Sequence, residues 1–217
     1  MEKFEDKNIC RECGGICCKK SGCDYFVSDF DNMKLEYLLS KLESGRISIV
    51  ATLHFNEIPN GQIVCNPFLS LRARNANRDV VDLLSFKTTC ASLQEDGCFY
   101  DIDERPSGAT TIVPGRNLTC YSTVDKYVEL EKWTPYQKVL RRIVKRLTGK
   151  SVEEKLREDV ENLFYQILKE EFSGVSEVEL ADINNMINIL QVVYKEESKK
   201  AVNRYNNEKQ GVLFRKK

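Results

Sequence analysis

The sequence predicts an α+β fold: an irregular, cysteine-rich module with a small β-hairpin over residues 1–124, followed by a C-terminal helical bundle over residues 125–217. Two observations predict this division. All nine cysteines and four of the five prolines precede Tyr121. The apolar pattern of the first part is short and irregular, whereas in the second part apolar residues recur at the spacing of a helix face. The chain of 217 residues is long enough to bury a substantial core.

The first part contains signals for one helix and one hairpin. Residues 29–42 space their apolar side chains along one helical face, with an aspartate at the start to cap the helix. Residues 46–55 largely alternate apolar and polar side chains, which indicates a strand. The turn sequence Pro59-Asn60-Gly61 follows, and residues 62–71 are a plausible partner strand. We therefore expect a β-hairpin in this region.

Three helices are predicted in the second part. Thr134 and a following proline start the first, whose apolar stripe runs over residues 136–147. The capping-box sequence S-x-x-E occurs twice, at Ser151 and at Ser176. The first precedes an apolar stripe over residues 152–168, and the second precedes one over residues 183–194. The links between these helices are short, which favours packing against one another as a bundle.

Charge and hydropathy point to no nucleic-acid or membrane partner. Lysine and arginine number 33, as do aspartate and glutamate, so the net field attracts neither nucleic acid nor acidic membrane strongly. No stretch reaches the ~18 apolar residues of a membrane-spanning helix, and the first ten residues lack the apolar segment of an export signal. We expect a cytoplasmic protein without membrane association.

Five cysteines lie within fourteen residues near the start of the chain: Cys10, Cys13, Cys17, Cys18 and Cys23. Thiolates are soft ligands, so this run can surround zinc or an iron–sulfur unit, a [4Fe–4S] cluster included. A disulfide framework is the alternative, but it requires an oxidising compartment that nothing in the sequence supports. The spacing therefore favours metal binding and leaves the identity of the metal open.

The later cysteines extend this hypothesis. The glycines after Cys13 can adopt a positive φ, as in a metal-binding turn. Cys90, Cys98 and Cys120 lie in a glycine- and proline-rich region that can fold back onto the N-terminal run. Eight thiolates suffice for two four-cysteine sites. Cys17 and Cys18 are adjacent, so we expect them to point in different directions and to serve separate metals or bridge them.

For three other groups of residues, namely Cys65, His54 and the arginines of residues 72–78, the sequence favours a role without chemistry over ligand binding or catalysis. Cys65 lies on a predicted strand away from the other cysteines, which favours a buried thiol over a ligand. His54, the sole histidine, is expected on an exposed strand face without a catalytic role. The arginines of residues 72–78 are expected in a solvated loop, with anion binding as the alternative. The basic side of the helix over residues 136–147 offers nucleic-acid binding as a further, less favoured hypothesis.

The cysteine pattern resembles the YkgJ-type cysteine-cluster family, a zinc- or iron-chelating CxxCxxCC domain. The resemblance covers the chain up to Cys120 and rests on four matches: C-x-x-C-G-G-x-C-C at residues 10–18, Gly22-Cys23, C-x7-C at Cys90 and Cys98, and Arg105-Pro106. The family often has a cysteine where this chain has Ala109, and Cys120 is the nearest replacement. The resemblance implies metal binding in a cytoplasmic, bacterial-type protein.

The sequence analysis thus leads to three functional hypotheses. The first is a metal-binding protein with a cysteine-ligated iron–sulfur or zinc site, acting as a redox- or metal-dependent module that engages a protein partner. The second is a metal-dependent enzyme that modifies a protein or peptide, because flagellin lysine N-methylases carry a similar cysteine cluster. The third is nucleic-acid binding through the basic helix face.

Overall fold

The computed structural model confirms an α+β protein, in which helices are combined with small two-stranded sheets. The chain divides into two compact units, which we call the first unit (Met1–Thr52 and Phe68–Ser151) and the second unit (Leu53–Pro67 and Val152–Lys217). The structure describes residues 3–20, 22–85, 89–95, 97–116, 119–169 and 177–215.

Two short helices begin the first unit. Helix α1 (Lys7–Cys13) is capped by the Asp6 carboxylate, which accepts hydrogen bonds from the backbone N–H groups of Asn8 and Ile9. It ends at Gly14, which has a left-handed φ of 63°. The backbone N–H groups at this cap donate to Cys10 O and Arg11 O, carbonyls of the last helical turn. Helix α2 (Ile16–Lys20) follows immediately. Most of the N-terminal cysteine run therefore lies on helices.

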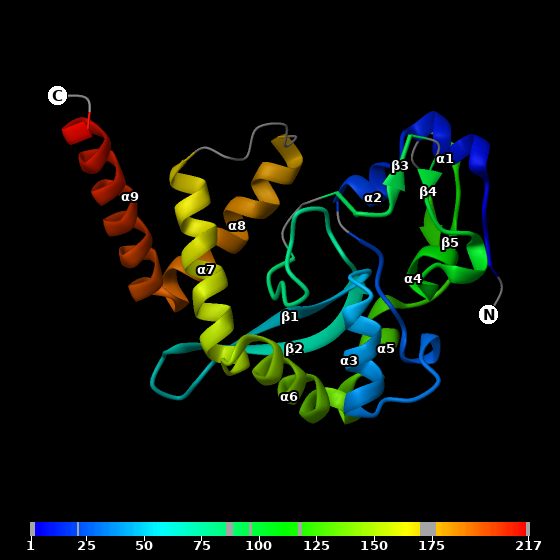
Figure 1. Ribbon diagram of the computed structural model, residues 1–217, viewed down its shortest axis with the longest axis horizontal. Coiled ribbons are helices and arrows are strands. Elements are labelled where there is room, and N and C mark those ends of the chain that lie inside the picture. Colours follow the sequence, from blue (N-terminus) through cyan, green and yellow to red (C-terminus); the bar gives the residue numbers. More distant parts are fainter. Residues whose placement is uncertain are drawn as a thin grey trace. The chain divides into compact units, whose positions relative to one another are not determined.

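A long hairpin and two helices form the centre of the first unit (Figure 1). Strands β1 (Ile47–Glu57) and β2 (Ile63–Ala73) pair as the sequence predicts, and residues 80–83 lie along β1 through the backbone hydrogen bond from Ile49 N to Val80 O, 2.7 Å. Helix α3 (Leu35–Glu43) follows a 3₁₀ turn, η1 (Val27–Asp29), so the predicted helix starts later than residue 29. Helix α3 contacts α6 (Gln137–Thr148).

Short elements connect the hairpin to α6. In chain order they are β3 (Leu93–Gln94), β4 (Gly97–Cys98), η2 (Ile102–Glu104), α4 (Ser107–Thr110), β5 (Ile112–Val113), β6 (Tyr121–Ser122), α5 (Lys126–Glu131) and η4 (Thr134–Tyr136). Strand β3 pairs with β4, and β5 pairs with β6, both antiparallel. These small ribbons carry or adjoin the later cysteines.

Buried apolar side chains from α3, the hairpin and α6 make the core of the first unit. The largest that are fully buried are Leu38, Leu42, Ile49, Leu69, Leu71, Leu83, Trp133, Leu140, Ile143 and Val144. They come from distant parts of the chain, so this core holds α3 and α6 to the sheet.

The second unit is helical apart from the tip of the hairpin. It contains α7 (Val152–Leu168), α8 (Glu177–Val193) and α9 (Lys195–Arg215), and α7 packs along α9. The start of α7 follows the prediction, whereas the Ser176 cap predicted for α8 lies outside the described residues. Helix α9 was not predicted. No helix in the described part of the chain is long and apolar enough to cross a membrane.

The division of the chain differs from the predicted boundary between residues 124 and 125. Helix α6 belongs to the first unit because Gln137 donates to Leu69 O and accepts from Leu69 N, both at 2.8 Å. Trp133 is 1% exposed, and its ring meets Phe30 edge-on at 5.9 Å. These contacts connect the α6 region to the hairpin and to residue 30, so a boundary based on cysteine content does not match the packing.

The core predicts a specific pattern of destabilisation along α6. Leu140→Ala should lower the free energy of unfolding by about 2–5 kcal/mol, because Leu140 is fully buried and its truncation leaves a cavity. Leu147→Ala, on the same helix but 43% exposed, should cost less than about 1 kcal/mol. Urea unfolding followed by the fluorescence of Trp133, the single tryptophan, measures both. Equal losses would contradict this assignment of the core.

Candidate metal centre

Seven of the eight predicted ligands line one cavity of about 160 Å³ in the first unit: Cys10, Cys17, Cys18, Cys23, Cys90, Cys98 and Cys120. The side chain of the eighth, Cys13, lies outside the described part of the structure. Among the eight cysteines with described side chains, Cys65 included, the structure pairs no two in a disulfide. The sequence prediction that these residues gather is therefore matched by the fold, while their role as ligands stays a prediction.

Two glycines make the turn that brings the N-terminal cysteines to this cavity. Gly14 and Gly15 have φ values of 63° and 69°, as the sequence analysis expects of glycines in this position. A Cβ on Gly15 would lie 2.6 Å from Leu93 Cδ1 and would displace that side chain, and the left-handed φ itself favours glycine. The turn reverses the chain between α1 and α2, and so Cys10 and Cys17 line the same cavity.

Backbone hydrogen bonds hold the later cysteines against the N-terminal run. Cys90 N donates to Cys18 O at 2.7 Å, and Ala73 N donates to Cys23 O at 2.8 Å. Tyr25 N donates to Leu71 O at 2.9 Å, which extends the contact along β2. The region of residues 90–120 thus lies against the N-terminal segment as predicted, through Cys90 and through Gly108 N, which donates to Asp24 O at 3.0 Å.

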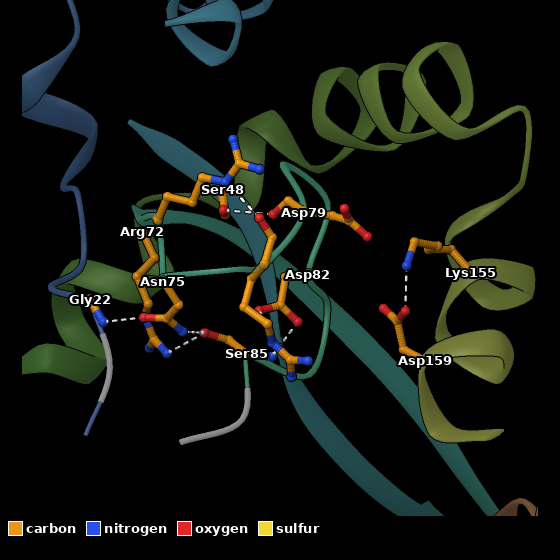
Figure 2. Close-up of polar contacts among 11 residues, drawn as sticks. Gly22, Ser48, Arg72, Asn75, Asp79, Asp82, Ser85, Lys155 and Asp159 are labelled. Atoms are coloured by element: carbon orange, nitrogen blue, oxygen red, sulfur yellow. Dashed lines mark hydrogen bonds and ion pairs between the residues drawn. The ribbon is translucent and has the colours of Figure 1, made fainter. Parts of the chain in front are cut away.

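A buried polar network supports this junction (Figure 2). Gly22 N donates to Asn75 Oδ1 at 2.6 Å, and Asn75 Nδ2 donates to Ser85 Oγ at 3.2 Å. Arg72 also reaches Ser85, and its Nε forms an ion pair with Asp24 at 2.7 Å. Because the partners are part-buried or buried, the network fixes the segment on both sides of Cys23.

The arginines of residues 72–78 are therefore not in a solvated loop, contrary to expectation. Arg72 lies in β2 and pairs with Asp24, Arg74 Nε donates to Arg78 O at 2.7 Å, and Arg78 pairs with Asp82 at 3.3 Å. These guanidinium groups serve the internal packing of the first unit. The partner of Arg72 is 48 positions away, that of Arg74 is a backbone carbonyl, and that of Arg78 is four residues along the chain, so composition alone did not reveal these contacts.

One pair of sulfur atoms, those of Cys17 and Cys18, has nearly the separation found between two ligands of one metal ion. Cys17 Sγ and Cys18 Sγ are 4.0 Å apart, so both side chains reach the same cavity and do not point apart as expected. In a tetrahedral site with metal–sulfur bonds of about 2.3 Å, sulfurs lie about 3.8 Å apart. No group of three or more Cys, His, Asp or Glu side chains in the described part of the chain is arranged to hold a metal ion as it stands.

Burial and neighbouring thiols together raise the pKa of three cavity cysteines. The pKa of Cys17 is raised by its hydrogen bond with Cys18 and by burial. The pKa of Cys18 is raised on balance. The hydrogen bond with Cys17 lowers it, but Cys23, burial and the charge of Cys90 raise it by more. Burial, with the charges of Cys98 and Cys17, raises the pKa of Cys90. A bound cation reverses these effects because it stabilises the thiolates.

Cys65 and His54 lie apart from the cavity, in the second unit. Cys65 is half-buried, and burial raises its pKa although a hydrogen bond with Tyr194 lowers it. This environment agrees with the expected structural thiol. His54 is exposed on β1, as expected of a strand face. On the basic face of α6, Arg146 pairs with Glu36 of α3 at 2.7 Å, so part of that face has an internal partner.

Comparison of the chain with protein-family models, curated proteins and solved structures finds no match.

The close packing at Gly22 predicts a strong effect of a small substitution. A Cβ on Gly22 would lie 1.9 Å from Ala73 O, so Gly22→Ala must displace backbone. We expect a loss of about 1–3 kcal/mol in the free energy of unfolding. Thermal or urea unfolding measures it, with the exposed Lys19→Ala as a control near zero. Equal stability of Gly22→Ala and wild type would show that this approach is not rigid.

The raised thiol pKa values predict that metal binding releases protons. The thiols are protonated at neutral pH, so affinity should rise with pH, by about tenfold per pH unit for each thiol that loses a proton. Competitive Zn²⁺ titration at several pH values, with calorimetry in buffers of different ionisation enthalpy, measures the slope and the proton count. An affinity independent of pH would contradict thiol ligation.

Proposed function

We propose that the first unit binds a metal through cysteine thiolates, as zinc or an iron–sulfur cluster, and that the protein is a metal-dependent interaction module. One observation carries the proposal: seven cysteines from four separate parts of the chain line a single cavity. Burial of thiols for packing alone gives no reason for seven of the nine cysteines to meet in one place.

The donor chemistry supports zinc or iron over harder metals. Thiolates prefer zinc, copper(I) and iron–sulfur clusters, whereas magnesium and calcium require oxygen ligands. The chain has a single histidine, and it does not line this cavity. With Cys13, the cysteines of the predicted set number eight, enough for one or two four-thiolate sites. The resemblance to cysteine-cluster proteins points the same way.

The short elements around the cavity indicate that a bound metal would stabilise this part of the fold. The cavity walls are short helices and two-residue strands, which bury little apolar area of their own. Ligation would join α1, α2, β4 and the segment before β6 at one point, adding folding free energy to the part with the least regular structure.

Exposed aromatic residues beside the cavity support a protein partner. Phe99 follows Cys98, Tyr121 follows Cys120, and each is 61% exposed. Aromatic side chains are enriched at protein interfaces, and metal ligation by the neighbouring cysteines would fix the backbone at both residues. A change in the metal or its oxidation state would therefore move the residues that present this surface. We place the function in such metal-dependent recognition, in the cytoplasm.

Metal content of cysteine variants tests the proposal. Cys90→Ser and Cys98→Ser should lower the metal bound per chain as much as Cys13→Ser does, because all three would remove a ligand of the same centre. Cys65→Ser is the matched control and should leave metal content unchanged, since Cys65 does not line the cavity. Anaerobic purification followed by metal, sulfide and absorption analysis gives the result. Equal loss in Cys65→Ser, or full metal content in Cys90→Ser, would contradict the assignment.

A further inference from the structure

The first unit contains a second cavity, of about 270 Å³, formed by residues 24–26, the hairpin and α5. Its inner wall is made of buried side chains: Phe26, Ser70, Glu129 and Trp133, which are 3%, 4%, 7% and 1% exposed. Lys126 and Tyr127 stand at the exposed side. The cavity thus has a closed inner end and an accessible rim, as small-molecule sites do.

Glu129 presents an unmet hydrogen-bond acceptor in this cavity. Its Oε1 accepts from Lys132 Nζ at 2.6 Å, whereas Oε2 is buried and has no hydrogen-bond partner among the described residues. Leaving a buried carboxylate oxygen unpaired costs free energy, and carboxylates accept several hydrogen bonds at once. Oε2 is closed to solvent as the side chain lies, and a rotation of the Glu129 carboxylate would turn it toward a ligand in this cavity that offers an N–H or O–H group.

The other charges of the cavity limit what that ligand can be. Asp24 and Arg72 already form an ion pair at 2.7 Å, and Arg72 also donates to Ser85. The remaining cation of the lining, Lys126, is exposed at the rim, so an anionic ligand at the buried end would lie beside Glu129, which would repel it. The buried end of the cavity therefore favours a donor, and a positively charged donor most, because hydrogen bonds between ionised groups are the stronger ones.

The aromatic side chains of the cavity provide the other contacts available to a ligand. Tyr25, Phe26, Tyr127 and Trp133 all line the cavity. Aromatic rings attract ammonium groups and pack against apolar bodies. We propose that this cavity binds a small molecule with a protonated amine on an apolar or aromatic body, with the ammonium donating to Glu129 Oε2. This site does not depend on the proposed metal centre, although Tyr25 lines both cavities.

Three matched probes test the charge preference: phenethylamine, phenethyl alcohol and 3-phenylpropionate, by ligand-observed NMR and calorimetry on the full chain. Phenethylamine should bind at least about tenfold more tightly than the alcohol, since hydrogen bonds to charged groups contribute more. The carboxylate should show no binding. Nα-acetyl-lysine methylamide distinguishes the source: tighter binding than phenethylamine supports an ammonium presented by a peptide, and weaker binding supports a free amine.

Variants of the same short helix test the contact. Glu129→Gln should weaken phenethylamine binding about tenfold or more, whereas Glu131→Gln, exposed on α5, should not change it. Glu129 also pairs with Lys132, so circular dichroism of the variant checks its fold. Tyr127→Ala gives an independent readout, because Tyr127 is 77% exposed and its loss spares the core; binding should weaken several-fold.

Three results would overturn the proposal. These are absence of binding by every amine probe, equal binding of phenethylamine and 3-phenylpropionate, and a folded Glu129→Gln variant with unchanged affinity for the amine.

Discussion

The close approach of residues 22–25 to the end of β2 is the constraint on which the rest of the first unit depends. Gly22 lies where no Cβ fits against Ala73 O, and Cys23 O accepts from Ala73 N. The ion pair of Asp24 with Arg72 continues the same contact. Main-chain pairing therefore sets the positions of the cysteines on either side, and both cavities form along this one segment, with Tyr25 in each wall.

The apolar core provides the support that this contact needs. Leu69 and Leu71, on β2, are fully buried, so the strand that receives residues 22–25 is itself fixed in the core. A site on short, irregular segments gains precision when those segments are bonded to such a strand. This arrangement explains how a region with little regular structure can bring seven cysteines to one cavity.

Periodicity and cysteine spacing predicted the hairpin, α6, α7 and the set of cysteines that meet, because those signals are local. Other features depend on distant partners. Helix α9 joins α7 through polar and aromatic contacts, such as Arg157 with Glu197 at 3.0 Å and Arg204 over the Tyr165 ring at 4.0 Å. Such contacts leave no apolar stripe to detect. Likewise, Arg72 forms an ion pair with Asp24, which lies 48 positions earlier in the sequence. The burial of Glu129 also depends on the fold and cannot be recognised from the sequence around it.

The central claim is that the cavity cysteines coordinate a metal, and X-ray absorption spectroscopy of the anaerobically purified, intact protein tests it most directly. The account predicts a zinc or iron edge with a first shell of sulfur at about 2.3 Å. A shell of nitrogen and oxygen alone, or a folded protein that retains no metal when supplied with zinc and iron, would contradict it.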